Sequence, residues 1–149
     1  MANASPAVAP SQSVLNLGSG RNPLPGATNL DIRGGRGVDV VGDAAALPFP
    51  DNSFDEIVAV NPFGFSPVTA ETARVLAPGG RLVVTGFPGN PTVAAVAELS
   101  SEDVGSLGFR IVDSRPARPS ETFGLMTRTD GSPITEFGDF RTYVFESTG

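Results

Sequence analysis

Three apolar segments, residues 14–17, 28–32 and 38–41, each end in residues that could hold a ligand. The first runs into the turn Gly18-Ser19-Gly20, the second contains Asp31 near its end, and the third is followed by Asp43. Glycine lets the backbone approach a ligand closely. One carboxylate could take the two hydroxyls of a ribose, and the other could meet the amino group of an adenine. Open α/β sheets bind ligands at the carboxyl ends of their strands, so the spacing predicts one shared nucleoside site.

Each feature also has a purely structural explanation. The glycines could form a tight turn, Asp31 could start the turn before Arg33-Gly34-Gly35, and Asp43 could cap a helix. Their arrival at three successive strand ends favours the shared site.

The segment after the glycine turn argues against a phosphate-bearing ligand. A dinucleotide fingerprint needs a third small residue and a helix whose N-terminus binds the pyrophosphate. Here Pro23 takes the place of the third glycine, and Pro23, Pro25 and Gly26 prevent a helix. The motif Gly-Lys-Ser/Thr occurs nowhere in the chain. A nucleoside without phosphate therefore fits best.

The composition excludes several kinds of chemistry. The chain has no Cys and no His, so it has no disulfide, no thiolate–imidazole zinc site and no Cys or Ser-His nucleophile. No metal site is predicted. A net charge of −6 counts against nucleic-acid binding through the phosphate backbone. Catalysis would depend on Asp, Glu, Tyr, Ser, Thr or Asn, or mainly on positioning.

The order of the predicted elements indicates an α/β fold. The 149 residues suffice for one domain over 13–149, preceded by a small, polar, disordered lead-in at 1–12. Signal-peptide features and long apolar runs are missing, so we expect a cytoplasmic protein without a membrane partner. The last two strands have no helix between them, which predicts an antiparallel edge pair. The expected strands are 14–17, 28–32, 38–41, 54–60, 81–85, 109–112 and 142–146, with helices within 66–77 and 91–99.

Four segments resemble the class I S-adenosylmethionine-dependent methyltransferases, in particular small, methyltransferase-11-like members with a reduced first helix. They are LNLGSG (15–20), NLDI (29–32), VVGDAAALPFPDNSFDEIVA (40–59) and ETARVLAPGGRLVVTG (71–86), within a resemblance that covers about residues 14–115. The resemblance implies a Rossmann-like sandwich: a mostly parallel sheet with an antiparallel C-terminal edge pair, here lacking the N-terminal cap helices. It also implies S-adenosylmethionine as the cofactor.

The resemblance assigns cofactor roles to eight residues. The turn Gly18-Ser19-Gly20 would pass under the methionine part, Asp31 with Ile32 would bind the ribose, and Asp43 with the Ala44 N–H would meet the adenine. Asn16 stands where the family often has an acidic residue. Its amide can accept a hydrogen bond from the cofactor's ammonium, without charge assistance.

The segment VNPFGF (60–65) resembles the Asn-Pro motif of methyltransferases that act on planar amino groups. By this resemblance Asn61 and the Pro62 carbonyl are catalytic and accept hydrogen bonds from a substrate amino group, while Phe63 and Phe65 contact the substrate. Arg128 is a further substrate candidate, or the tip of a hairpin. A strand-ending turn is the alternative for Asn61-Pro62.

The predicted function is S-adenosylmethionine-dependent methyl transfer to an unidentified acceptor, with a planar amino group as the candidate. Two alternatives stay open: a non-catalytic module that acts through a protein partner, or the terminal module of a larger delivered protein. A homodimer could bury sheet surface that the missing helices leave exposed.

Overall fold

The computed structural model describes residues 13–20, 22–118, 121 and 139–149. Its frame is a single seven-stranded sheet with the strand order β3-β2-β1-β4-β5-β7-β6. Strands β1 to β5 are parallel, and β7 is antiparallel to both of its neighbours. The strands are β1 Val14–Leu17, β2 Thr28–Asp31, β3 Val40–Val41, β4 Phe54–Val60, β5 Leu76–Gly86, β6 Phe109–Pro116 and β7 Arg141–Ser147. The helices are α1 Ala70–Val75, α2 Pro91–Ala97 and α3 Ser101–Leu107.

The predicted fold class is confirmed, including the antiparallel pair at the C-terminal edge. Residues 22–27, with their prolines, contain no helix, as the sequence predicts. The predicted lead-in 1–12 lies outside the described residues.

Several elements differ from the prediction. Strand β5 begins at Leu76 instead of residue 81, because an irregularity in its pairing with β4 carries the chain through Pro78-Gly79-Gly80. Strand β3 is only two residues long. Helix α3 was not predicted; a capping box between Ser100 and Asp103 starts it, and Gly108 ends it with φ 101°.

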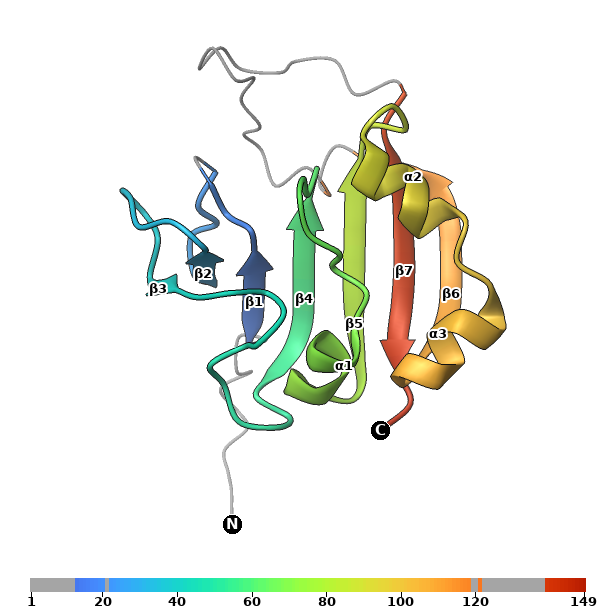
Figure 1. The fold of residues 1–149 in the computed structure, drawn as a ribbon, viewed down its shortest axis with the longest axis horizontal. Helices are drawn as coiled ribbons and strands as arrows, with labels where there is room; N and C mark the ends of the chain where they lie inside the picture. The colour runs from blue at the N-terminus through green and yellow to red at the C-terminus, as the bar shows by residue number, and fades with distance from the viewer. Residues whose placement is uncertain (1–12, 21, 119–120, 122–138) are drawn as a thin grey trace.

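Both faces of the central strands are buried, which explains their continuous apolar sequence. In β4, Ile57 belongs to the main core cluster, whereas the next residue, Val58, faces a second cluster with Val83 and Val144. The three helices lie in front of β4 to β7, while β1 to β3 have only loop segments in front of them (Figure 1). No described helix is long and apolar enough to cross a membrane.

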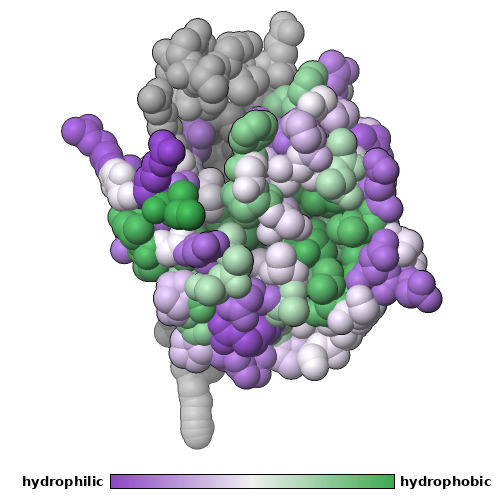
Figure 2. Space-filling view, viewed as in Figure 1, coloured by the Kyte–Doolittle hydropathy of each residue, from purple (hydrophilic) through white to green (hydrophobic). Residues whose placement is uncertain are grey.

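The loop between β3 and β4 takes the place of a helix over the first strands. Leu47 is buried, and Phe49 packs edge-on against Phe54 with ring centroids 4.9 Å apart. Arg74 of α1 fixes this loop by donating to the carbonyl oxygens of Phe49 (2.8 Å) and Leu47 (3.0 Å). Hydrophilic side chains accordingly gather over α1 and the loop that leads into β4 (Figure 2).

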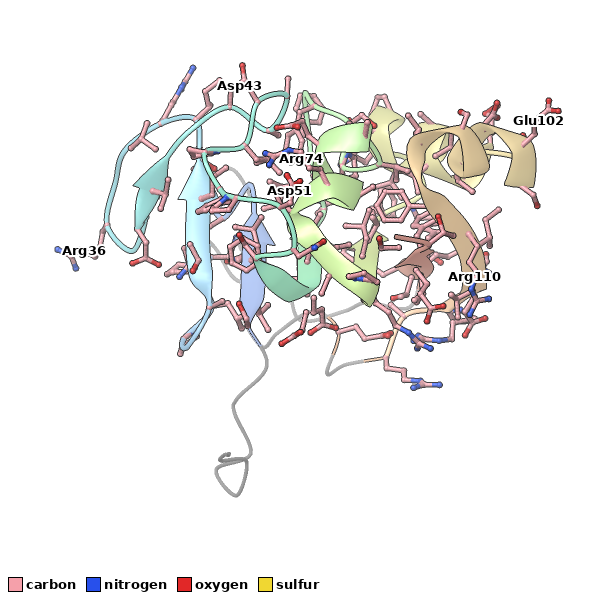
Figure 3. All side chains as sticks on the ribbon, turned by 90° about the horizontal axis from the view of Figure 1, so that it is seen from below. Arg36, Asp43, Asp51, Arg74, Glu102 and Arg110 are labelled. Atoms are coloured by element: carbon pink, nitrogen blue, oxygen red, sulfur yellow. The ribbon has the colours of Figure 1, made fainter. Side chains whose placement is uncertain are left out.

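Two acidic residues hold the Arg74 side chain in the position from which it binds this loop. Arg74 forms ion pairs with Asp51 (2.9 Å) and Glu71 (2.7 Å), and Asp51 and Arg74 lie together in the view from below (Figure 3). Glu71 also accepts a hydrogen bond from the Leu47 N–H at 2.8 Å. The hydrogen bond from Arg74 lowers the pKa of Glu71, so the carboxylate is charged at neutral pH. The loop that carries Asp43 is therefore tied to the helical half of the molecule.

Candidate functional site

A cavity of about 530 Å³ lies at the carboxyl ends of β1, β2, β3 and β4. Its volume is in the range of small-molecule sites. The predicted site residues that the structure describes all line it: Asn16, Gly18, Ser19, Gly20, Asp31, Ile32, Asp43, Ala44, Asn61, Pro62, Phe63 and Phe65. Arg128, the remaining candidate, lies outside the described residues. The two aspartates thus share one cavity, as the strand order predicts.

The glycine turn is fixed to β2 by backbone hydrogen bonds. The N–H groups of Gly18 and Ser19 both donate to the Leu30 carbonyl, at 2.9 and 3.0 Å. Gly18 has φ 74°, and a Cβ atom there would lie 2.7 Å from the ring of Phe65. Glycine is therefore favoured at position 18 by the left-handed backbone conformation, and a side chain there would also have to displace the ring of Phe65.

Asn29 organises the segment between β1 and β2 in place of a helix. Its Oδ1 accepts hydrogen bonds from Asn16 Nδ2 (2.8 Å) and the Leu24 N–H (2.7 Å). Its Nδ2 donates to the carbonyls of Leu24 and Ala27 and to Asp39 Oδ2. Because Asn29 is only 6% exposed, these partners could not be replaced by water without rearrangement.

Asn16 presents an acceptor to the cavity. Its Nδ2 is used by Asn29 and by the Asn22 carbonyl (3.1 Å), so the amide orientation is set by the fold. None of the described residues donates to Asn16 Oδ1. This leaves the amide oxygen for a donor on a ligand.

The two aspartates combine a turn role with free acceptor capacity. Asp31 Oδ2 accepts from the Gly20 N–H at 2.8 Å, and its Oδ1 accepts from the Arg33 N–H at 3.1 Å. Asp43 Oδ1 accepts from the Ala45 N–H at 2.8 Å, but no helix follows, so the helix-cap explanation of Asp43 is wrong. Each carboxylate oxygen can accept more than one hydrogen bond, so both residues can still bind a ligand.

Two buried polar atoms on the cavity wall lack partners. Ser19 Oγ and Asn22 Oδ1 are both buried, and neither has a hydrogen-bond partner among the described residues. Such atoms are costly unless a ligand or water satisfies them. Together with the glycine turn and the two carboxylates, they fit a polar ligand that carries several donors and acceptors.

The Asn61-Pro62 turn differs from its expected arrangement. Asn61 adopts the left-handed conformation with φ 47°, at the end of β4. Its Oδ1 accepts hydrogen bonds from Asn90 Nδ2 (3.1 Å) and the Phe87 N–H (3.2 Å). Asn90 Nδ2 also donates to the Pro62 carbonyl at 2.7 Å. Both acceptors that were expected to meet a substrate amino group therefore already accept from the Asn90 amide; Asn61 Oδ1 is filled, and the Pro62 carbonyl keeps one lone pair.

Apolar side chains surround the mouth of the cavity. Phe63 is 75% exposed and Ile32 is 66% exposed. Phe65 is half-buried against Gly18. Exposed aromatic and aliphatic groups of this kind suit contact with an apolar ligand.

The fold and the comparisons together define the class. A seven-stranded sheet with an antiparallel β7 between β5 and β6 is the fold of class I methyltransferases. Residues 7–84 match the family described as methyltransferase domain, and the chain belongs to this S-adenosylmethionine-dependent methyltransferase family. S-adenosylmethionine is the methyl donor of class I methyltransferases.

One relative and two solved structures illustrate the similarity. The ubiquinone/menaquinone biosynthesis C-methyltransferase UbiE of Hahella chejuensis is 43% identical over 119 residues, which are 74% of this chain and 43% of the relative. The 16S rRNA methyltransferase KamB superposes with a TM-score of 0.62 at 18% identity, covering 93% of this chain and 89% of that one. A 16S rRNA (adenine(1408)-N(1))-methyltransferase from Catenulisporales acidiphilia, solved with the cosubstrate SAM, gives 0.61 at 12% identity, covering 93% and 86%.

The solved structures and the curated relatives support different conclusions about this chain. The identities to the solved structures are low, so they show the fold alone. The chain spans less than half the length of the curated relatives that it matches.

Sequence reasoning missed the contributions of Asn29 and Asn90. Asn90 caps α2, because its Oδ1 accepts from the Thr92 N–H at 2.9 Å, and its Nδ2 forms the contacts with the Asn61-Pro62 turn. The sequence indicated these hydrogen bonds only through the number of asparagines next to strand ends. Their partners could not be assigned from that pattern.

Proposed function

We propose that this chain binds S-adenosylmethionine in the cavity at the carboxyl ends of β1 to β4 and transfers its methyl group to an acceptor at the apolar mouth. One observation carries the proposal: the residues predicted for the cofactor at the ends of β1, β2 and β3 line a single cavity of suitable volume, together with the residues predicted for the substrate after β4.

The proposed contacts follow from the free atoms of the site. Asp31 takes the ribose hydroxyls while its Oδ2 holds the Gly20 N–H. Asp43, with the Ala44 N–H beside it, meets the adenine. Asn16 Oδ1, to which none of the described residues donates, accepts from the ammonium group.

Bound S-adenosylmethionine supplies a methyl group on a sulfonium sulfur, a good leaving group for in-line displacement. The contribution of the chain is to hold acceptor and donor in line, which can account for several kcal/mol of the barrier. Phe65 packs on Gly18, so it can fix the wall next to the methionine part. This mechanism needs no histidine base.

The planar amino group is the second candidate acceptor in this proposal, because Asn90 occupies both acceptors of the Asn61-Pro62 turn. An amine that donates to Asn61 Oδ1 would have to displace the Asn90 amide or the Phe87 N–H, and only the Pro62 carbonyl keeps a free lone pair. The relatives' name, C-methyltransferase, supports a carbon acceptor instead.

The other functional alternatives make different predictions. In each of them the function depends partly on residues or molecules outside the described cavity. They are a non-catalytic module, a module of a larger protein and a homodimer. The first would bind the cofactor without transferring a methyl group, or would not bind it.

Calorimetric titration with S-adenosylmethionine and S-adenosylhomocysteine tests the proposal. Wild-type protein should bind both, and Asp31→Asn should weaken binding about 10-fold or more, because hydrogen bonds to a charged group contribute about 1.5–3 kcal/mol. Glu102→Gln makes the same change in charge on exposed α3, far from Asp43 (Figure 3), and should bind like wild type. No heat with wild type, or equal binding by Asp31→Asn, would contradict the proposal.

A further inference from the structure

The orientation of the Asn61 amide is fixed by neighbouring backbone groups that can only donate or only accept a hydrogen bond. The Phe87 N–H can only donate, so the atom of Asn61 that it contacts at 3.2 Å is the oxygen. Asn90 is fixed likewise, because the Pro62 carbonyl can only accept and the Thr92 N–H can only donate. These assignments do not depend on a choice between the oxygen and nitrogen of either amide.

The acceptor capacity of Asn61 is consequently filled. An amide oxygen has two lone pairs, and Asn61 Oδ1 already accepts from Phe87 and Asn90. The nitrogen, Asn61 Nδ2, has no hydrogen-bond partner among the residues that the structure describes. The side chain lines the cavity and is half-buried. The group that Asn61 has left for a ligand is therefore a donor.

The backbone beneath Asn61 keeps the amide in place. The Asn61 N–H donates to the Thr85 carbonyl at 2.5 Å. A Cβ atom at Gly86 would lie 3.1 Å from Asn61 Oδ1, 3.2 Å from its Cα and 2.5 Å from Val93 Cγ2. Asn61 is thus held by its backbone hydrogen bond to Thr85 of β5 and by the side chain of Asn90, the N-cap of α2.

We propose that Asn61 Nδ2 donates a hydrogen bond to an oxygen of the methyl acceptor, and that Asn90 is the positioning residue that turns the amide this way. The acceptor class is then an apolar ring that carries a hydroxyl or carbonyl oxygen, held against Phe63 and Phe65. An amine is disfavoured, because its N–H groups would face the Asn61 donor. The inference rests on the proposed function, since it places this acceptor beside the bound cofactor.

A matched pair of ring compounds tests the proposal: 1-naphthol and 1-naphthylamine differ only in the group that would face Asn61. S-adenosylhomocysteine binding to wild type is measured first by calorimetry, so a failure of the proposed function is seen separately. Each ring compound is then titrated into the saturated protein while the side-chain NH₂ resonances of Asn61 are followed by ¹⁵N NMR. We expect 1-naphthol to bind about 10-fold more tightly than 1-naphthylamine and to shift those resonances.

Two variants separate donor recognition from a general structural role. Asn61→Asp keeps an acceptor for Phe87 and Asn90 but removes the donor, so it should abolish the preference for 1-naphthol. Asn90→Ser keeps a good helix cap but frees Asn61 Oδ1 and the Pro62 carbonyl, so binding of 1-naphthylamine should rise several-fold. Thermal unfolding of both variants checks that they fold.

Several outcomes would overturn the proposal while leaving cofactor binding intact. They are equal or tighter binding of 1-naphthylamine by wild type, a preference for 1-naphthol that survives Asn61→Asp, and binding of neither compound by the saturated protein.

Discussion

The first three strands and the last four are built in different ways. Strands β1, β2 and β3 have four, four and two residues, and the described residues 13–20 and 22–53 contain no helix. Strands β4 to β7 have seven to eleven residues and are accompanied by three helices. The comparison shows that loops can replace covering helices when side-chain hydrogen bonds hold their backbones in place.

Two residues, which we call tethers, hold the loops around β1, β2 and β3 in place. Asn29 holds the segment after the glycine turn, and Arg74 holds the loop between β3 and β4. In the second half, apolar contacts between helices and sheet dominate, with fully buried residues such as Val93 and Val104. The cavity lies mainly in the polar half, so its shape should depend on a few hydrogen bonds.

The largest effect is expected from Asn29→Leu. The change removes the partners of Asn16 Nδ2 and of the Leu24 N–H and carbonyl, and each buried polar group left unsatisfied costs about 1–3 kcal/mol. We expect a loss of about 3 kcal/mol in the free energy of unfolding, measured with urea, together with a loss of S-adenosylhomocysteine binding.

The companion variant Leu82→Ala tests the other half. It should cost a comparable 2–5 kcal/mol through a cavity in the apolar core but leave affinity unchanged under conditions where the protein is folded. If Asn29→Leu were as stable as wild type, the proposed difference between the halves would be wrong.

The next effect concerns the glycine turn. Gly18→Ala should cost about 2–3 kcal/mol, because it adds a collision with Phe65 to the roughly 1–2 kcal/mol of left-handed strain. At Gly20, with φ 50°, the nearest atom to an added Cβ is Asp31 Oδ2 at 4.0 Å, so Gly20→Ala should show the strain alone. Urea unfolding of both variants gives the difference. Equal losses would mean that Phe65 moves aside freely.

A smaller effect is expected at the second tether. Arg74→Met removes the donors to Leu47 and Phe49, so it should lower the urea midpoint of unfolding and weaken cofactor binding a few-fold. Faster amide hydrogen exchange at Leu47 would show where the structure loosens, because its N–H donates to Glu71, which Arg74 orients.

Arg110→Met is the control for Arg74→Met. Arg110 is 57% exposed in its pair with Glu146, at the far side of the molecule from Asp43 (Figure 3). Exposed pairs contribute about 0–1 kcal/mol, so this variant should bind the cofactor normally. Similar behaviour of the two variants would remove the special role of Arg74.

How much the sequence could predict depends on how local the signals are. The glycine turn and Asp31 were predictable because each adjoins its own strand, and strand order alone brings them together. Helix α3 was missed although Ser100 and Asp103 form a capping box, since the helix is short and has a glycine at position 105. The pairing of Asn61 with Asn90 spans 29 residues and depends on how β5 leads into α2, which no local pattern specifies.

The smallest effect is a pH dependence in the long-stranded half. Burial raises the pKa of Glu56, and the nearby Arg81 offsets only part of the increase. The folded state therefore holds this proton more strongly than the unfolded state, so stability falls as the pH rises through the range above the ordinary value near 4.5.

Glu56→Gln should remove this loss of stability. We expect a gain of a few tenths of a kcal/mol at pH 7, limited by solvent screening of a partly exposed group, and no gain below pH 4. Urea unfolding at both pH values measures it. A gain that is the same at both would contradict the ionisation argument.

Titration of ¹⁵N-labelled protein with S-adenosylhomocysteine, followed residue by residue through the backbone amides, tests the cofactor site most directly. The account predicts the largest shifts at Gly20, Ile32 and Ala44, which come from three different strand ends, and no shift along α3. Saturable shifts confined to β6 and β7, or none at those three amides, would contradict it.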